Sequence, residues 1–127
     1  MRSKYGNKWT EIDGHKFQSK AEAARYVYLL EQLRTGKITC LKLQPRFDFV
    51  VNGTPLKSYK RRQLSYKGDF LYHIPLGQGK TEVVCEDVKG FETDVWNIKW
   101  ALVKACFPAT KFRAVYKRGD DWEVKGE

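Results

Sequence analysis

The chain has 127 residues, of which 42% are hydrophobic, so it can bury the core of one compact domain and is not a disordered segment. Its 24 Lys and Arg residues against 15 Asp and Glu give a formal net charge of +9. Such an excess favours a polyanionic partner, because each cation placed on a phosphate releases condensed counterions. The alternative is a basic protein that its charge merely keeps in solution.

The first part of the chain predicts a hairpin and a helix. Residues 1–16 are interpreted as a basic arm with a short hairpin that turns at Asp13-Gly14. A helix is then expected from Ser19 to about Arg34, because apolar residues recur at helical spacing and Gly36 follows them.

Three strands are expected next. The segment Ile38–Val51 is rich in apolar and β-branched residues, is broken at Pro45, and closes at the turn Asn52-Gly53. Two further strands are predicted over Leu64–Ile74 and Thr81–Lys89. The connection between these two is short and contains glycine, so they should be antiparallel neighbours.

The last predicted elements are a helix and a strand. The helix is expected over Asp94–Cys106, with an apolar stripe on one side and Pro108 as its stop. The strand is expected over Lys111–Tyr116, and residues 118–127 are interpreted as a loose acidic tail. The order helix, three strands, helix, strand predicts a single-domain α/β sandwich with a mixed central sheet flanked by helices.

Disulfide, zinc and membrane classes are excluded by the residue usage. Cys40, Cys85 and Cys106 are far apart and odd in number, so they frame neither a disulfide scaffold nor a paired zinc site. The two histidines are too isolated for a zinc cluster. The chain has neither the apolar run of a signal peptide nor a stretch of about 18 apolar residues to span a membrane. We therefore expect a soluble protein of the cytoplasm.

Charged residues end an apolar strand at Asp87-Val88-Lys89. Asp87 and Lys89 are two residues apart, so on a strand they project from one face with their bases about 7 Å apart. Antiparallel pairing would place Asp69 of the preceding strand beside Asp87. Two adjacent carboxylates need a cation to offset their repulsion, and oxygen ligands suit Mg²⁺ or Mn²⁺. A metal there predicts phosphodiester hydrolysis, with Lys89 at the phosphate or the attacking water.

The same spacing also has a plain explanation. An acid followed two residues later by Lys is frequent by chance in so charged a chain, and it recurs at Glu123-Val124-Lys125 in the polar tail. Asp87 and Lys89 would then be a surface ion pair that adds little stability.

Four short motifs occur in an order typical of a known nuclease group. They are Phe17–Tyr26 (FQSKAEAARY), Leu43–Phe47 (LQPRF), Gly68–Phe70 (GDF) and Glu86–Gly90 (EDVKG). In this order they resemble the PD-(D/E)XK nuclease superfamily, and more narrowly a phage-borne branch related to Holliday-junction-resolvase-like and restriction-type endonucleases. The resemblance covers about residues 4–117.

The resemblance implies the superfamily's α-β-β-β-α-β fold and a division of roles. Asp69 and Asp87 would be metal ligands, Lys89 the catalytic lysine, and Glu22 an accessory acid and metal ligand from the first helix. Two residues depart from the pattern. Gly68 stands where the superfamily name has Pro, and the second acid is Asp87 where Glu is commoner.

Glu22 has a second interpretation. Ser19-Lys20-Ala21-Glu22 matches a capping box, in which the Glu side chain bonds back to the amide of Ser19. A glutamate can cap the helix in the free protein and still face a metal, so both roles stay open.

A basic stretch precedes Asp69. Residues 51–68 contain no acid, and Tyr59 and Tyr66 are interleaved with the cations. Basic side chains grip phosphates whatever the sequence, and aromatic rings stack on exposed bases. The residues expected to bind nucleic acid are Lys57, Lys60, Arg61, Arg62, Lys67 and, from the second helix, Lys99. The alternative is that they are solvated residues of a hairpin tip and a helix surface.

These features predict a metal-dependent endonuclease of phage origin that hydrolyses phosphodiester bonds of DNA in the host cytoplasm. Mg²⁺ is the expected cofactor, with Mn²⁺ as a substitute. Cutting would be structure-selective, on branched or single-stranded DNA, or nonspecific on DNA and RNA, and a homodimer would suit a branched substrate. The alternatives are a nucleic-acid-binding protein without catalysis and a phage protein-interaction module.

Overall fold

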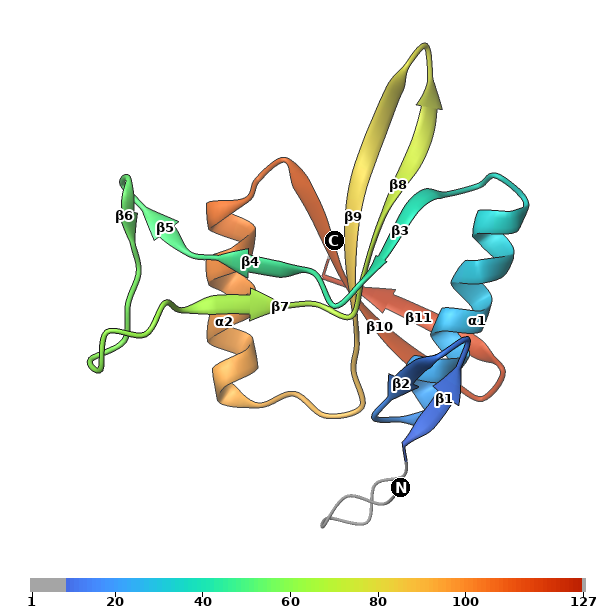
Figure 1. Cartoon of the computed structure of the whole chain (residues 1–127), viewed down its shortest axis with the longest axis horizontal. Coiled ribbons are helices and arrows are strands. Elements are labelled where there is room, and N and C mark those ends of the chain that lie inside the picture. Colours follow the sequence, from blue (N-terminus) through green and yellow to red (C-terminus); the bar gives the residue numbers. More distant parts are fainter. Residues whose placement is uncertain (1–8, 127) are drawn as a thin grey trace.

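A five-stranded mixed sheet forms the centre of the computed structural model, which describes residues 9–126 (Figure 1). Its strands lie in the order β11-β10-β9-β8-β3. They are β3 (Thr39–Leu43), β8 (Phe70–Gly77), β9 (Lys80–Val88), β10 (Thr110–Arg118) and β11 (Asp121–Lys125). β9 and β10 run parallel, and the other neighbours are antiparallel. This sheet and its two helices confirm the predicted single-domain α/β class.

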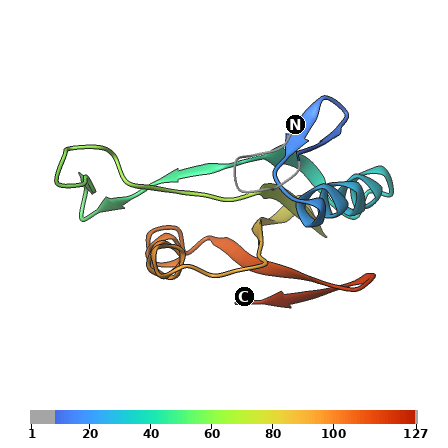
Figure 2. The same ribbon diagram turned by 90° about the horizontal axis from the view of Figure 1, so that it is seen from below.

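The two helices pack on opposite faces of the sheet and lie well apart (Figures 1 and 2). They are α1 (Lys20–Arg34) and α2 (Asp94–Cys106), close to their predicted bounds. Each begins at a hydroxyl cap, because Ser19 Oγ accepts from the Glu22 N–H and Thr93 Oγ1 from the Trp96 N–H, both at 3.0 Å. α2 is the crossover that the parallel strands β9 and β10 require. Neither helix within residues 9–126 is long and apolar enough to cross a membrane.

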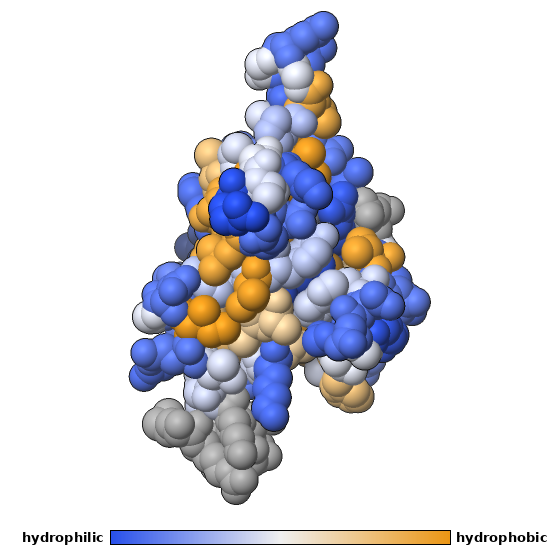
Figure 3. Space-filling model, turned by 90° about the vertical axis from the view of Figure 1, so that its right-hand side faces the viewer, coloured by the Kyte–Doolittle hydropathy of each residue, from blue (hydrophilic) through white to orange (hydrophobic). Residues whose placement is uncertain are grey.

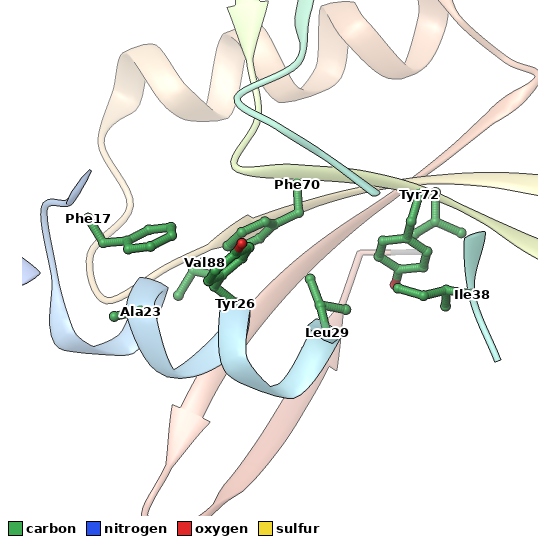
Figure 4. Close-up of a cluster of buried hydrophobic side chains, with 9 residues drawn as sticks. Phe17, Ala23, Tyr26, Leu29, Ile38, Phe70, Tyr72 and Val88 are labelled. Carbon is green, nitrogen blue, oxygen red and sulfur yellow. The ribbon is translucent and has the colours of Figure 1, made fainter. Parts of the chain in front are cut away.

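The core between α1 and the sheet is built largely from aromatic and branched side chains (Figure 4). Tyr26 and Leu29 of α1 pack against Phe70 and Tyr72 of β8. The rings of Tyr26 and Phe70 are stacked with their centroids 6.3 Å apart. A second cluster on the α2 face contains Phe49, Tyr66, Cys85, Val103 and Phe112. The apolar stripe predicted for α2 therefore faces the sheet.

A short hairpin precedes α1. β1 (Thr10–Ile12) pairs with β2 (His15–Phe17), and the chain turns at Asp13-Gly14 as predicted. Both turn residues have a positive φ, 52° and 80°, which is typical of a two-residue hairpin turn. The basic arm expected before the hairpin, at residues 1–8, lies outside the described residues.

Residues 46–67 form an arm that projects from the sheet past α2 (Figures 1 and 2). The turn predicted at Asn52-Gly53 lies in this β4–β7 arm, where both residues have a positive φ. Its two strand pairs are β4 (Arg46–Asp48) with β7 (Ser65–Lys67), and β5 (Val50–Val51) with β6 (Thr54–Pro55).

The single strand predicted over Leu64–Ile74 is wrong, because the chain breaks at Gly68-Asp69 between β7 and β8. A Cβ at position 68 would lie 2.5 Å from Cys85 Sγ, so the close approach of the two segments requires glycine there. The Gly68 N–H donates to the Pro45 carbonyl, and the Asp69 N–H donates to the Glu86 carbonyl, both at 2.9 Å. The break turns the chain from the arm into the sheet and places Asp69 immediately before β8.

The loose tail predicted at residues 118–127 is also wrong. β11 pairs antiparallel with β10 after a turn at Gly119, whose φ is 62°. Trp122 packs against the α1-side core, and Arg118 and Glu123 form an ion pair across the hairpin at 3.1 Å. The acidic composition of the segment concealed an alternation of apolar and charged residues that is typical of a strand.

Candidate active site

Successive residues at the end of β9 face opposite sides of the sheet, as the geometry of a strand requires. Val84 and Val88 belong to the core under α1, whereas Cys85 belongs to the core under α2. Glu86 therefore faces α1, and Asp87 and Lys89 face α2 together. The predicted same-face placement of Asp87 and Lys89 is confirmed.

Asp87 is held by three neighbours. Its Oδ2 accepts hydrogen bonds from the Tyr66 hydroxyl at 2.5 Å and from the Trp96 indole N–H at 2.8 Å. Its Oδ1 lies 3.5 Å from Lys89 Nζ, and that ammonium also lies 4.7 Å from the centroid of the Trp96 ring. The side chains of Asp87 and Lys89 are only 7% and 17% exposed, so the alternative of a surface ion pair is wrong.

Asp69 lies beside Asp87, as the pairing of their strands predicted. Its Oδ2 accepts a hydrogen bond from the Val88 N–H at 2.7 Å. Burial and the nearby carboxylate of Asp87 raise the pKa of Asp69 to about 9, and the charge of Glu22 adds to the shift. A carboxyl group with so high a pKa is one whose negative charge is poorly compensated by its surroundings.

Glu22 reaches the same group of acids from the first turn of α1. Burial and the charge of Asp87 raise the pKa of Glu22, while Lys89 lowers it. Within residues 9–126 the structure shows no hydrogen bond from the Ser19 N–H to the Glu22 carboxylate, although Ser19 Oγ accepts from the Glu22 N–H. Only the Ser half of the predicted capping box is formed, and the carboxylate of Glu22 lies within electrostatic range of Asp69 and Asp87.

The chemistry of these acids fits a hard divalent cation. The donors are carboxylate oxygens, and the raised pKa of Asp69 reflects negative charge that a cation would offset. Mg²⁺ keeps several waters and needs only one or two carboxylates. The described part of the chain contains no group of three or more His, Cys, Asp or Glu side chains already placed to hold a metal. Asp69 and Asp87 are therefore the pair that fits, with Glu22 beside them.

Two pockets of about 390 and 160 Å³ open beside Glu22 and Asp69. Glu22, Gln44 and Asp69 line both of them. Lys16 of β2 lines the larger pocket, and Lys67 of β7 lines the smaller one. No sequence pattern pointed to Lys16, and Gln44 was part of the LQPRF motif without a role of its own, because the hairpin and the β3–β4 connection meet α1 only in the folded chain.

Glu86 is a fourth acid, and the fold neutralises it. It is fully buried, and Arg25 of α1 donates to both of its oxygens at 2.7 Å. The Tyr72 hydroxyl donates to Glu86 as well, and Arg113 donates to the Tyr72 oxygen at 3.2 Å. The sequence signal for this pair was an arginine among the apolar residues of α1. Glu86 is therefore a structural acid, unlike its neighbour Asp87.

The residues predicted to bind nucleic acid lie in three places. Four of them are exposed in the loop between β6 and β7, at the far end of the β4–β7 arm: Lys57, Lys60, Arg61 and Arg62. Lys67 is exposed at the inner end of the arm, beside the acids, and Lys99 is half-buried on α2. Tyr59 is fully exposed, whereas Tyr66 is buried and cannot stack on a base. The side of the molecule seen in Figure 3 is mainly hydrophilic, with small apolar patches.

A family model described as "Protein of unknown function (DUF1064)" matches residues 2–120. The chain belongs to this family, because the match covers nearly all of its length. No curated protein and no solved structure matches the chain. Similarity therefore assigns a family to the chain, while the roles of the acids depend on their geometry.

Replacing Asp69 by Asn is expected to flatten the pH dependence of stability of the metal-free protein. Unfolded Asp69 ionises at its ordinary pKa of 3.8, whereas folded Asp69 keeps its proton up to about pH 9. Between these values the folded state binds more protons, so the free energy of unfolding falls as the pH rises. Asn can still accept the Val88 N–H bond but carries no charge. Denaturant unfolding in EDTA between pH 4 and 9 measures the effect.

Asp121→Asn, an exposed aspartate on β11, is the matched control and should keep the wild-type profile. Parallel pH profiles for Asp69→Asn and the wild type would contradict the close approach of Asp69 and Asp87.

Proposed function

We propose that this member of the DUF1064 family is a metal-dependent endonuclease that hydrolyses phosphodiester bonds of DNA, with Mg²⁺ as cofactor and Mn²⁺ as a substitute. The observation that carries the proposal is the placement of Asp69 beside Asp87: Asp69 bonds to the Glu86 carbonyl and to the Val88 N–H, on either side of Asp87. Glu22 of α1 lines the same two pockets as Asp69. Lys89 completes the group, because its ammonium lies 3.5 Å from Asp87. A net charge of +9 suits a phosphate polymer as the substrate.

The order of elements supports the same proposal. α1, β3, β8, β9, α2 and β10 follow the α-β-β-β-α-β order implied by the resemblance to the PD-(D/E)XK superfamily. Asp69 precedes β8 and Asp87 lies near the end of β9, where that pattern expects its acids. Gly68 stands where the pattern has Pro, and the close contact with Cys85 explains why a glycine is needed there. Membership of that superfamily is therefore part of the proposal.

Asp69 and Asp87 are the residues that would hold the ion, with Glu22 as an accessory ligand. When bound, the ion supplies a Lewis acid that polarises a phosphate oxygen and offsets charge on the leaving oxygen. Tyr66 and Trp96 keep Asp87 in one orientation, because both donate to the same oxygen. The second oxygen is then fixed toward Lys89.

Lys89 acts on the phosphate or on the attacking water in this scheme. Its ammonium is kept in place by Asp87 and by the face of the Trp96 ring. From there it donates a hydrogen bond to a phosphate oxygen, where negative charge grows during hydrolysis, or orients the water. Lys89 and Asp87 lie on the same face of the sheet, so in this scheme both act on one phosphate group.

Catalysis explains Asp69 better than a structural role does. A structural acid of this fold looks like Glu86, which is fully buried and has both oxygens paired with Arg25. Asp69 differs, because within residues 9–126 no Lys or Arg is in ion-pair contact with it, and a second carboxylate lies beside it. Burying an acid in this way is unfavourable, and such groups concentrate at functional sites.

The grip on the nucleic acid is assigned to the exposed cations. The loop at the end of the β4–β7 arm contains a cluster of cations and no acid. Lys67, at the inner end of the arm, lines the smaller pocket together with Glu22 and Asp69. Lys99 adds a cation on α2. Contacts of this kind bind phosphates whatever the sequence, so cutting depends on the structure of the substrate or is nonspecific.

Asp87→Asn and Lys89→Ala are each expected to lower Mg²⁺-dependent cleavage by on the order of 100-fold or more, because each removes a charge that acts on the reacting phosphate. Purified proteins are incubated with plasmid, single-stranded and four-way-junction DNA. Lys125→Ala is the matched control, because Glu123 and Lys125 have the same spacing on β11 and should be dispensable. Undiminished cleavage by Asp87→Asn would show that Asp87 has no part in catalysis.

Glu22→Gln separates the two interpretations of Glu22. Gln serves in a capping box as Glu does, so a pure cap predicts an almost silent substitution. A metal role predicts a steep loss of activity at limiting Mg²⁺ that higher Mg²⁺ partly restores, with an unchanged melting temperature. We expect the second result, because in the described part of the chain the Glu22 carboxylate accepts no hydrogen bond from the Ser19 N–H. Glu31→Gln on the exposed face of α1 is the control, and wild-type turnover of Glu22→Gln at limiting Mg²⁺ would return Glu22 to the cap.

Replacing Lys60, Arg61 and Arg62 together by Ala is expected to weaken DNA binding and to flatten its salt dependence. Each lost phosphate contact reduces the slope of log affinity against log salt by about one. Fluorescence anisotropy in EDTA measures binding without cleavage. Arg34, Lys37 and Lys80 replaced together by Ala give the same change of net charge away from the arm. An equal slope for both triple variants would show that the arm tip does not touch phosphate.

A further inference from the structure

Gln44 has a backbone conformation that its side chain disfavours. Six non-glycine residues within residues 9–126 have a positive φ, and Gln44 is one of them, at 52°. Asp13, Asn52 and Gln78 each begin a two-residue hairpin turn and are followed by Gly, which explains their values. Gln44 is followed by Pro45, which normally drives the residue before it toward extended backbone. No hairpin turn accounts for its φ.

The backbone of Gln44 is tied to the segment that carries Asp69. Its N–H donates to the Asp69 carbonyl at 2.9 Å, and the Pro45 carbonyl accepts from the Gly68 N–H at the same distance. These bonds use backbone atoms alone, so any residue at position 44 can make them. A glycine or asparagine would adopt the left-handed region at lower cost than a glutamine. The turn therefore explains the backbone of Gln44 and leaves its side chain unexplained.

Gln44 lies where its side chain could contact a bound nucleic acid. Together with Glu22 and Asp69, Gln44 lines both pockets beside the acids. Lys16 lies in the larger pocket and Lys67 in the smaller one, so a cation is available for phosphates on each side. An amide is neutral and both donates and accepts, so it can bind a phosphate or sugar oxygen next to carboxylates without adding charge.

We propose that Gln44 is a substrate-positioning residue, whose side-chain amide contacts the nucleic-acid strand where it passes from one pocket to the other over Glu22 and Asp69. The proposal rests on the proposed nuclease function and names the part of the surface that the cut strand occupies. Strained backbone of this kind is typical of functional sites, where the surrounding structure holds a residue in place. Here the bond between the Gln44 N–H and the Asp69 carbonyl couples the placement of the amide to that of the acid.

The chain contains a matched control for this proposal. Gln78 is also an exposed glutamine with a positive φ, 54°, but it lies at the outer end of the β8–β9 hairpin, away from the acids (Figure 1). Gln44→Gly and Gln78→Gly should each raise the melting temperature by about 4 °C, because glycine accepts a positive φ without strain. Only Gln44→Gly and Gln44→Ala should weaken binding of a single-stranded oligonucleotide, by about threefold to tenfold for one lost hydrogen bond.

Binding is measured by anisotropy in EDTA, and cleavage is measured in Mg²⁺ with the same variants. We expect Gln44→Gly to be more stable than the wild type yet weaker in binding and slower in cutting, whereas Gln78→Gly gains stability alone. Gln44→Asn, which keeps an amide and tolerates the positive φ, should recover part of the binding. A Gln44→Gly protein that binds the oligonucleotide as tightly as the wild type would overturn the proposal.

The two proposals can fail separately. Absence of Mg²⁺-dependent cleavage by the wild-type protein would refute the nuclease function, while the binding measurements in EDTA would still decide the role of Gln44. Weaker binding by Gln44→Gly and Gln44→Ala, with unchanged binding by Gln78→Gly, would support a strand contact even then.

Discussion

The buried ion pair between Arg25 and Glu86 decides which carboxylate of β9 is structural and which is available for chemistry. Glu86 and Asp87 are adjacent, so the strand must send them to opposite faces. On the α1 face Arg25 binds both oxygens of Glu86 at 2.7 Å, and a slip of the strand by one residue would leave that arginine without its partner. Breaking a buried pair in this way costs about 3–5 kcal/mol. The register that keeps Glu86 on Arg25 is the same register that keeps Asp87 and Lys89 on the α2 face.

On the α2 face, by contrast, two neutral hydrogen-bond donors hold the carboxylate of Asp87. Tyr66 and Trp96 bond to Asp87, and both rings are packed in an aromatic cluster with Trp100, whose ring centroid lies 4.9 Å from that of Trp96 and 6.2 Å from that of Tyr66. The cluster restricts the rotamers of both donors, so the carboxylate is fixed without a neutralising cation in direct contact with Oδ2. Tyr66 also belongs to β7, the strand that leads out along the arm. The hydrogen bond from Tyr66 to Asp87 therefore fixes the inner end of the arm next to the candidate site.

The parts of the fold that could be predicted from the sequence are those set by local sequence patterns. The cap Ser19 and the turns at Asp13-Gly14 and Asn52-Gly53 act within a few residues, and the structure has an element starting or turning at each of them. The proximity of Asp69 to Asp87 followed from one short connection between antiparallel strands. The error at Gly68 has a non-local cause, because the break depends on Cys85. The pairing of Glu86 with Arg25, 61 residues away, has no local signal either. Gln44 enters the site in the same way, through a bond to a segment that no local pattern connects to it.

The placement of the cations limits how a nucleic acid can lie on the proposed site. The basic loop at the end of the β4–β7 arm lies away from α1 and from the start of β8 (Figures 1 and 2), whereas Lys16 and Lys67 line the pockets that Glu22 and Asp69 also line. A strand that uses every one of these cations must run along the arm, pass Lys67, and enter pockets of about 160 and 390 Å³. Those volumes accept a phosphate or a nucleotide, so only a short part of a bound strand enters them. In the proposed scheme the arm therefore holds a part of the nucleic acid that lies next to the strand in the pockets, and one bound molecule spans both regions.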